Sequence, residues 1–363
     1  MGKQKVLSSS KTGLREACAR AFGCSLLAAC CSILLTGCSG AQSALDAAGP
    51  QAGNIGLHLK EMVYVLTAVF VIVMCALAVA ALRGRVARGG PASIAPDIKD
   101  DPDRQRRMTR NVSVAVGITI LILFALLASS FITGRSLYTT VAAKPDTLTI
   151  EISGHQWWWE IRYDDPTPSR TLTTANEIHI PTGRPVLFKL TSTDVIHSFW
   201  VPNLHGKTDL IPGHITTTLI RADRAGTYRG QCAEYCGHQH AHMAFTVVVE
   251  PPDKFQQWYE AQLQPAPQPS TPSQARGQQV FLTSPCVMCH KIQGTDAGGM
   301  VGPDLTHIAS RPTIAAGTLE NTRGHLAGWV VNSQEIKPGN RMPPNNIQPD
   351  DLQALLDYLQ SLK

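Results

Sequence analysis

Two long stretches without a charged residue constrain the fold of this 363-residue chain more than any other feature. They run from Met62 to Leu82, over 21 residues, and from Asn111 to Gly134, over 24 residues. An α-helix needs about 20 apolar residues to span the hydrocarbon core of a bilayer, so both stretches are long enough. A buried hairpin of a soluble protein is the alternative, which runs of this length disfavour. The sequence therefore predicts a transmembrane hairpin over residues 59–135.

The charge distribution predicts the orientation of this hairpin. The formal net charge is +5 with histidine neutral, and the segment 83–110 between the apolar stretches holds eight lysines and arginines against four acidic residues. Because positively charged loops stay in the cytoplasm, we expect 83–110 to be cytoplasmic and the chain after residue 135 to lie outside. No cluster of basic and aromatic residues predicts binding to nucleic acid.

The first 37 residues have the pattern of a secretory signal peptide. Five basic residues precede an uncharged stretch, Ala21 to Gly37, and the end of this stretch together with Cys38 reads L-T-G-C. This ending resembles the cleavage site of bacterial lipoproteins, which implies that Cys38 is lipidated and begins an exported segment, 38–58. A plain signal peptide or an uncleaved membrane helix is the alternative. All of these interpretations place the following residues outside the cytoplasm, in agreement with the predicted orientation.

The pattern after residue 140 predicts two soluble domains. Short segments within 140–252 are rich in β-branched residues, often alternating, and Pro, Gly and Asp separate them, which is typical of a β-sandwich. Residues 253–263 have the pattern of a short helix, and a Pro-rich linker follows and ends at residue 274. Residues 275–363 carry helical patterns, the last of which repeats leucine with a period near 3.6 residues.

Residues 232–243 read C-A-E-Y-C-G-H-Q-H-A-H-M and concentrate metal-binding side chains. Thiolate and thioether sulfur select soft metals such as copper, and imidazole suits copper or zinc. Two cysteines supply enough sulfur to bridge two copper ions, with one further histidine required from elsewhere in the chain. The alternatives are a disulfide between Cys232 and Cys236, a structural zinc site, and histidines that are merely exposed in a loop.

Residues 55–260 resemble subunit II of haem-copper cytochrome c oxidases, a family that carries a binuclear copper-A centre on a cupredoxin sandwich. The family motif C-x-E-x-C-x3-H-x2-M matches within 232–243, and the family segment D-x-x-H-S matches D-V-I-H-S, which contains His197. The resemblance implies that Cys232 and Cys236 bridge both copper ions and that each ion binds one histidine. The implied copper-A ligands are His197, Cys232, the Glu234 carbonyl, Cys236, His240 and Met243.

The resemblance also assigns roles beside the copper centre. The Glu234 carboxylate is expected to help bind a magnesium ion at the junction with subunit I. The stretch G-H-Q-W-W-W-E, 154–160, resembles an aromatic region of the family, which implies that electrons enter at Trp157. Packing is the alternative for Trp157. Neighbours without an implied ligand role are interpreted as packing or surface residues: Trp158, Trp159, His238 and His242.

The motif C-V-M-C-H at 286–290 is the signature of covalent haem c attachment. Cys286 and Cys289 are expected to form thioethers with the haem, and His290 is expected to be an axial ligand. A zinc site or a redox-active C-x-x-C is the alternative, which the adjacent histidine and the helical context disfavour. Because haem c is attached outside the cytoplasm, this signature agrees with the predicted topology.

The candidates for the second axial ligand are Met300, Met342, His307 and His325. Met342 lies in N-R-M-P-P, which resembles the distal methionine loop of small bacterial cytochromes c and implies that Met342 is the ligand. G-P-D-L at 302–305 resembles the segment after the haem histidine, which implies that the Pro303 carbonyl accepts the ring proton of His290. Residues 275–363 are therefore expected to form an all-α class I cytochrome c domain.

Together these resemblances imply a multidomain membrane protein that is subunit II of a terminal cytochrome c oxidase. Electrons would pass from its own haem c to copper-A and then to subunit I, where oxygen reduction is coupled to proton translocation. The expected partners are subunit I, subunit III and a soluble or membrane-bound electron donor. The expected location is the bacterial inner membrane, with both soluble domains on the periplasmic face. The alternatives are a copper-A subunit of a nitric oxide reductase and a non-catalytic copper-binding lipoprotein.

Overall fold

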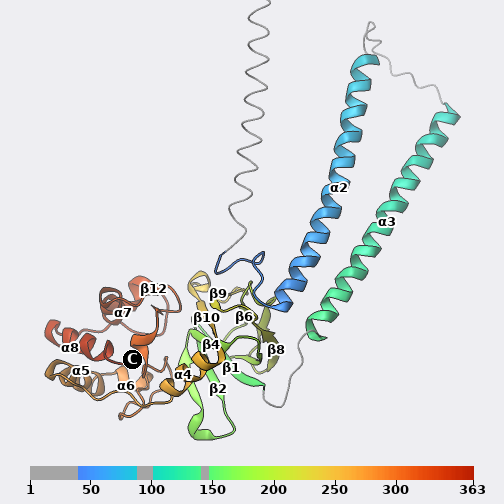
Figure 1. Cartoon of the computed structure of the whole chain (residues 1–363). Helices are drawn as coiled ribbons and strands as arrows, with labels where there is room; N and C mark the ends of the chain where they lie inside the picture. The colour runs from blue at the N-terminus through green and yellow to red at the C-terminus, as the bar shows by residue number, and fades with distance from the viewer. Residues whose placement is uncertain (1–39, 88–100, 140–146) are drawn as a thin grey trace, which may run out of the picture.

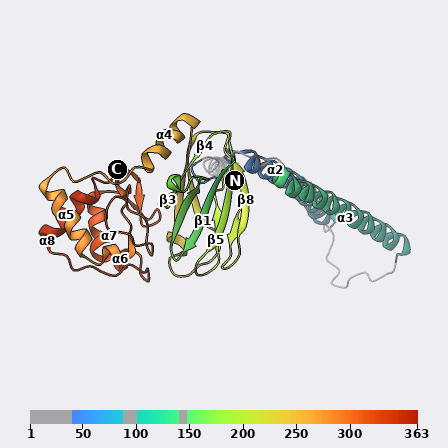
Figure 2. The ribbon, with the colours of Figure 1, turned by 90° about the horizontal axis from the view of Figure 1, so that it is seen from below.

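The computed structural model describes residues 40–87, 101–139 and 147–363. The predicted signal peptide, the predicted lipidation site Cys38 and the central part of the predicted cytoplasmic loop lie outside these residues. Figure 1 shows a pair of long helices, a β-sandwich and a mainly helical C-terminal domain. Figure 2 shows that the sandwich lies between the C-terminal domain and the long helices.

The two long helices are α2 (Pro50–Ala87) and α3 (Pro102–Thr139), and they contain the two uncharged stretches. The side chains of Asn54 and Ser136 form a hydrogen bond of 3.3 Å between the two helices. The most apolar window of each helix is 0% buried, so the structure contradicts the alternative of a buried soluble hairpin. Length, hydropathy and exposure make both helices candidate membrane spans.

Residues 148–250 form the sandwich domain, which has two five-stranded sheets. The first sheet has the order β3-β2-β1-β5-β8 and the second the order β4-β10-β9-β6-β7. The strands of the first sheet are β1 (Leu148–His155), β2 (Trp158–Asp164), β3 (Leu172–Ala175), β5 (Pro185–Ser192) and β8 (Thr216–Arg221). Those of the second are β4 (Glu177–Pro181), β6 (His197–Trp200), β7 (Thr208–Leu210), β9 (Gly226–Cys232) and β10 (Ala244–Glu250).

The core of the sandwich domain follows from alternation along the strands. In β5 the buried side chains of Val186, Phe188 and Leu190 alternate with half-buried ones, so one face of the strand points inward. The ring of Phe188 meets that of Phe199 from the other sheet, at 5.2 Å between centroids, and Phe199 stacks on Phe245 at 4.7 Å. These rings form a close-packed base near the ends of β6 and β9, where the cysteine-rich stretch begins.

The segment before α2 and the first turn of α2 bind the sandwich domain. The buried Asn203 side chain donates hydrogen bonds to the carbonyls of Gly40 and Asp46, at 3.1 and 2.8 Å. The buried Gln51 amide donates to the carbonyl of Leu219 at 2.8 Å. These contacts join the sandwich domain to the start of α2, and Figure 1 shows the sandwich at this end of the helical pair.

Helix α4 (Pro252–Gln262) leads from the sandwich to the C-terminal domain, residues 272–363. This domain contains α5 (Pro272–Thr283), α6 (Cys286–Cys289), α7 (Arg323–Ile336) and α8 (Pro349–Leu359). A short hairpin of β11 (Thr313–Ile314) and β12 (Leu319–Glu320) adds to the helices that the sequence predicted. Helices α5 and α8 touch at Gly277, where an added Cβ would lie 2.0 Å from the carbonyl oxygen of Ala354. Only glycine therefore permits this close helix contact.

Candidate metal centres

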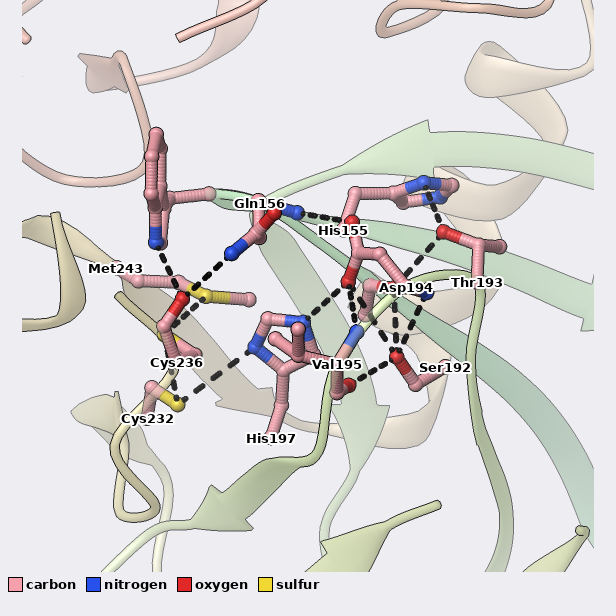
Figure 3. A network of polar contacts seen from close by, with 12 residues as sticks. His155, Gln156, Ser192, Thr193, Asp194, Val195, His197, Cys232, Cys236 and Met243 are labelled. Carbon is pink, nitrogen blue, oxygen red and sulfur yellow. Dashed lines mark hydrogen bonds and ion pairs between the residues drawn. The ribbon is translucent and has the colours of Figure 1, made fainter. Parts of the chain in front are cut away.

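The structure brings together the thiol, thioether and imidazole groups of the predicted copper-A site. The Sγ atoms of Cys232 and Cys236 lie 3.8 Å apart. Nδ1 of His197 is 3.9 Å from Cys232 Sγ, and Nδ1 of His240 is 3.7 Å from Cys236 Sγ. Sδ of Met243 lies 3.8 Å from the same Cys236 sulfur. His197 and the two cysteines form a group that could hold a metal ion (Figure 3).

These residues come from two strands and the loop that joins β9 to β10. His197 begins β6, Cys232 ends β9, and Met243 directly precedes β10. His197 and Met243 are fully buried at 0% exposure, and both cysteines are 2% exposed. A sulfur separation of 3.8 Å is far longer than the S–S bond of about 2.05 Å, so the cysteines do not form a disulfide.

Asp194 orients His197. Its Oδ1 atom lies 2.9 Å from Nε2 of the imidazole, which directs Nδ1 toward Cys232. The same carboxylate accepts the backbone N–H groups of Gln156 and Val195, at 2.7 and 2.8 Å (Figure 3). A carboxylate that holds the far nitrogen of a ligand histidine fixes its tautomer and ring orientation.

The ionisation of the cysteine pair favours one thiolate. The thiol of Cys236 and the imidazole of His197 lower the pKa of Cys232 to about 3, although burial opposes this shift. The hydrogen bond with Cys232, burial and the negative charge on Cys232 in turn raise the pKa of Cys236. Burial would lower the pKa of His197, but hydrogen bonds with Cys232 and Asp194 raise it. A bound cation would release the second thiol proton, because thiolate is the form that ligates metals.

Glu234 faces the site with its backbone and the surface with its side chain. Its carbonyl oxygen lies 3.2 Å from Sγ of Cys232. Its carboxylate is 44% exposed and forms an ion pair of 3.1 Å with Lys207. The two ends of this residue are therefore available for different interactions.

The three consecutive tryptophans have different surroundings. Trp157 is buried, and its Nε1–H donates to the carbonyl of Cys236 at 2.9 Å. Trp158 stacks on His155 at 4.3 Å between ring centroids. Trp159 is 1% exposed and packs in the core against Phe245, at 5.0 Å between centroids. Trp159 therefore has the packing environment that the sequence predicted.

The three histidines of residues 232–243 differ in exposure and in their polar contacts. His238 and His242 are exposed, and His240 is half-buried. Nδ1 of His242 lies 2.8 Å from Oε1 of Gln239, whereas Nδ1 of His240 lies near the Cys236 sulfur. The sequence interpretation of His238 and His242 as surface residues agrees with this exposure.

A pocket in the C-terminal domain brings together the predicted haem-binding residues. Its lining includes Cys286, Cys289, His290, Pro303 and Met342. The sandwich domain contributes four further lining residues, which are Gln156, Trp157, Trp158 and Asn176. The pocket therefore lies at the boundary of the two domains.

His290 is held by the segment that follows it. Its Nδ1 atom lies 2.8 Å from the Pro303 carbonyl, which accepts the ring N–H. This hydrogen bond uses Nδ1 and does not involve Nε2. Burial lowers the pKa of His290, so the neutral imidazole is favoured. An added Cβ on Gly302 would lie 2.7 Å from Cε1 of His290, so only glycine permits this close approach of backbone to ring.

The four candidates for the second axial ligand occupy different places. Met342 lines the pocket. Met300 is 79% exposed, and the pocket lining does not include it. His307 is buried elsewhere, with Nδ1 at 2.9 Å from the Lys363 carbonyl and Nε2 at 3.1 Å from that of Gln264. His325 is exposed, and its Nδ1 lies 2.9 Å from the Glu320 carbonyl. Met342 therefore has the most favourable position of the four.

Arg311 is a buried cation in the same pocket. It is 7% exposed, and its guanidinium donates to the Asp304 carbonyl at 2.7 Å. Among the described residues, its buried Nε atom has no hydrogen-bond partner. Burial lowers the pKa of Arg311, which reflects the cost of a charge held away from water. A carboxylate in the pocket would satisfy this group.

Three residues near the sites were not predicted from the sequence. Asp194 precedes His197 by three residues in D-V-I-H-S, so the segment contained a signal for its proximity. Arg311 and Lys337 carried no local signal, because their positions depend on contacts with distant parts of the chain. Lys337 is 2% exposed and lies beside Trp157 at the domain boundary.

The comparisons with known proteins agree on both domains. Residues 148–250 match the family model "Cytochrome C oxidase subunit II, periplasmic domain", and residues 274–363 match the family model "Cytochrome c". Cytochrome c oxidase subunit 2 of Alkalihalophilus pseudofirmus is 33% identical over 341 residues, which cover 92% of this chain and 94% of the relative. The Bacillus subtilis protein of the same name is 30% identical, over 60% of this chain and 63% of the relative.

A solved structure also matches part of the chain. The periplasmic domain of subunit II of cytochrome oxidase (CoxB) of Bradyrhizobium japonicum is 31% identical, with a TM-score of 0.31. The match covers 34% of this chain and 96% of that domain. The family matches imply copper in the sandwich domain and haem in the C-terminal domain. The sequence match along most of both chains shows that this protein belongs to the cytochrome c oxidase subunit II family, with a cytochrome c domain at its C-terminal end.

Proposed function

We propose that this chain is the electron-relay subunit of a terminal oxidase in the bacterial inner membrane. Electrons would pass from a covalent haem c to a binuclear copper-A centre and then to subunit I, where oxygen is reduced and protons are translocated. Both soluble domains would lie on the periplasmic face, with subunit III as a further partner. The proposal is supported by family membership and by the two separate groups of ligand side chains.

The residues of the sandwich domain fit a copper-A centre. Cys232 and Cys236 would bridge the metals, His197 and His240 would each bind one, and Met243 and the Glu234 carbonyl would be weak ligands. Soft sulfur and borderline imidazole donors in a buried site suit copper. Their positions on strands and a short loop limit movement of the ligands when the charge of the site changes.

The residues of the C-terminal pocket fit haem c. Cys286 and Cys289 on α6 would form the thioethers, and His290 and Met342 would be the axial ligands. The Pro303 carbonyl holds the imidazole of His290, and the unpartnered Nε of Arg311 suits a haem propionate. When bound, haem and copper-A supply one-electron redox chemistry, and the chain positions them and limits access of water.

The magnesium proposal concerns the surface of the sandwich domain. Magnesium prefers six oxygen ligands, and the exposed Glu234 carboxylate supplies one side chain beside the cation Lys207. The other protein ligands of such an ion would come from subunit I. Lys207 would have to move away from Glu234 when the ion binds.

The position of Trp157 between the two proposed centres is the observation that connects them. Its indole donates to the carbonyl of Cys236, and the residue also lines the pocket that contains His290 and Met342. A single buried residue therefore lies at both the proposed copper loop and the proposed haem pocket. We assign Trp157 the role of the side chain through which electrons enter the copper site.

The first experiment measures copper and iron in the purified full chain after haem attachment and copper loading. Two copper ions and one haem iron per chain are expected, with an electron paramagnetic resonance signal delocalised over two equivalent copper nuclei. Rapid photoreduction of the haem should be followed by reduction of copper, and Trp157→Phe should slow this step without changing either spectrum. One copper or none in a folded, haem-loaded chain would contradict the copper-A assignment.

A further inference from the structure

Lys337 is a buried lysine on the boundary between the sandwich domain and the C-terminal domain. Its Nζ atom donates to the carbonyl oxygens of Trp157 at 2.8 Å, His242 at 2.9 Å and Ala315 at 3.1 Å. The first two acceptors belong to the sandwich domain and the third to the C-terminal domain. Each proton of the ammonium group therefore has an acceptor, and the three acceptors come from both sides of the boundary.

The chemical form of Lys337 follows from two opposing effects. Burial lowers its pKa to about 7. The three carbonyl acceptors oppose this shift and favour the ammonium form, because a neutral amine has only two N–H donors. The cost of removing a buried ion from water offsets the free energy that its hydrogen bonds contribute. Such a group therefore fixes geometry more than it adds stability.

The acceptor Ala315 belongs to a turn with an uncommon backbone conformation. Ala315, Ala316 and Gly317 have φ angles of 55°, 58° and 74°, in the left-handed region that alanine rarely adopts. The Ala316 carbonyl accepts the backbone N–H of Ala244, at 3.0 Å across the boundary. Strained residues persist where their surroundings fix them, and both alanine carbonyls are bound here.

The loop after Lys337 passes over the proposed electron-entering ring. An added Cβ on Gly339 would lie 3.6 Å from Cη2 of Trp157. Gln239 of the sandwich domain donates to the Pro338 carbonyl at 2.9 Å. This loop continues to Met342, so the residue proposed as the haem ligand is the fifth residue after Lys337.

A second basic residue of this loop reaches the sandwich domain more weakly. Arg341 lies 3.7 Å from Asp194, and its side chain is 65% exposed. Solvent and salt screen such a pair, which contributes little to the free energy of docking. Of these two cations, the buried Lys337 is therefore the one that defines the relative position of the domains.

We propose that Lys337 is a positioning residue that fixes the C-terminal domain on the sandwich domain, with the Met342 loop over Trp157. It thereby sets the rate of electron transfer from haem to copper. The effect on the rate of electron transfer rests on the proposed function. The docking role of Lys337 concerns only the contact between two domains of this chain.

The test uses the full chain with both centres loaded and compares wild type with Lys337→Met, Lys337→Gln and Lys254→Met. Methionine keeps the length of the side chain without a donor, and glutamine keeps a shorter donor. Lys254 is an exposed lysine on α4 and controls for the general loss of a positive charge. Hydrogen exchange of the Ala244 amide reports docking, because this N–H donates to Ala316 across the boundary.

For Lys337→Met we expect faster Ala244 exchange and slower haem-to-copper electron transfer, each by at least about tenfold, because three buried acceptors lose a charged donor. Electron transfer should also become dependent on solvent viscosity, since motion of the domains would then limit it. Haem absorption and the copper resonance should stay unchanged. Lys337→Gln should give a smaller effect, and Lys254→Met should match wild type.

Two results would overturn the proposal. One is an Ala244 exchange rate and an electron-transfer rate within about twofold of wild type in Lys337→Met, against the tenfold expected from the lost hydrogen bonds. The other is loss of haem from both Lys337 variants, since the lysine would then serve the fold of the C-terminal domain itself. If the wild type holds both metals without electron transfer between them, the proposed function fails, while Ala244 exchange still tests the docking role.

Discussion

Nδ1 of His240 lies 3.7 Å from Sγ of Cys236, in the loop between β9 and β10. His242, two residues later, is exposed, and its Nδ1 instead lies 2.8 Å from the Gln239 side chain. Neighbouring histidines of one short loop therefore have different surroundings. This difference separates a proposed ligand from a surface residue and provides a matched pair of variants.

We predict that His240→Ala removes copper binding and that His242→Ala retains it. Loss of a direct ligand should reduce copper affinity by more than the roughly 10–100-fold expected for outer partners of a metal site. Copper content and the copper resonance of the two purified variants measure the effect. Equal copper content in His240→Ala and His242→Ala would remove His240 from the ligand set, and the haem spectrum serves as the internal control for folding.

Met342 and Met300 form a second matched pair. Met342 lines the pocket with His290, whereas Met300 is 79% exposed. Because a methionine ligand raises the potential of a c-type haem, Met342→Ala should lower the reduction potential and remove the sulfur-to-iron absorption band. Met300→Ala should leave both unchanged. A potentiometric titration monitored by absorption distinguishes them, and the opposite pattern would assign Met300 as the ligand.

Gly302 should tolerate no side chain. A Cβ at this position would meet Cε1 of His290 at 2.7 Å and Nδ1 at 3.0 Å, so Gly302→Ala must displace the ring or the Pro303 carbonyl that binds it. Overpacking of this kind costs about 1–3 kcal/mol. We expect a lower yield of covalent haem and a lower thermal midpoint of the C-terminal domain.

Gly298→Ala is the control for this variant, because an added Cβ there would meet no atom within 4 Å. Haem yield and thermal unfolding should match wild type in Gly298→Ala. If Gly302→Ala also attached haem with a normal spectrum and thermal midpoint, the close approach between this backbone and His290 would have no functional consequence.

The lowered pKa of His155 predicts that the free energy of unfolding depends on pH. Burial is the main cause that lowers its pKa to about 4, from an ordinary value of 6.5. The unfolded chain therefore binds the proton more readily than the folded chain between these two values. Stability that is present above pH 6.5 is lost progressively as the pH falls toward 4, by at most about 3 kcal/mol.

His155→Gln should flatten this part of the profile, because glutamine does not titrate. The thermal midpoint of the sandwich domain, measured in the full chain at a series of pH values between 4 and 7, compares the variant with wild type. His155 stacks on Trp158, so the variant should lose some stability at every pH. An unchanged slope of thermal midpoint against pH would show that His155 is not the titrating group.

Local sequence patterns predicted most of the elements but missed four strands of the sandwich domain and the short β11–β12 hairpin of the C-terminal domain. β1, β5 and β10 follow from alternating, β-branched segments whose buried faces the structure places in the core. β2 was missed because its start was interpreted only as an aromatic region. β3, β6 and β7 have three or four residues each, too few for a periodic pattern to be recognised.

The two sulfur motifs, the apolar stretches and the Pro-rich linker were determined by the sequence itself, because each depends on residues close together in the chain. The proximity of His197 to Cys232, which are 35 positions apart, was implied only by the family resemblance, and its physical cause is the pairing of β6 with β9. The contact of Lys337 with Trp157 joins residues 180 positions apart. No local pattern encodes such a contact, since it depends on how two separately formed cores pack against each other.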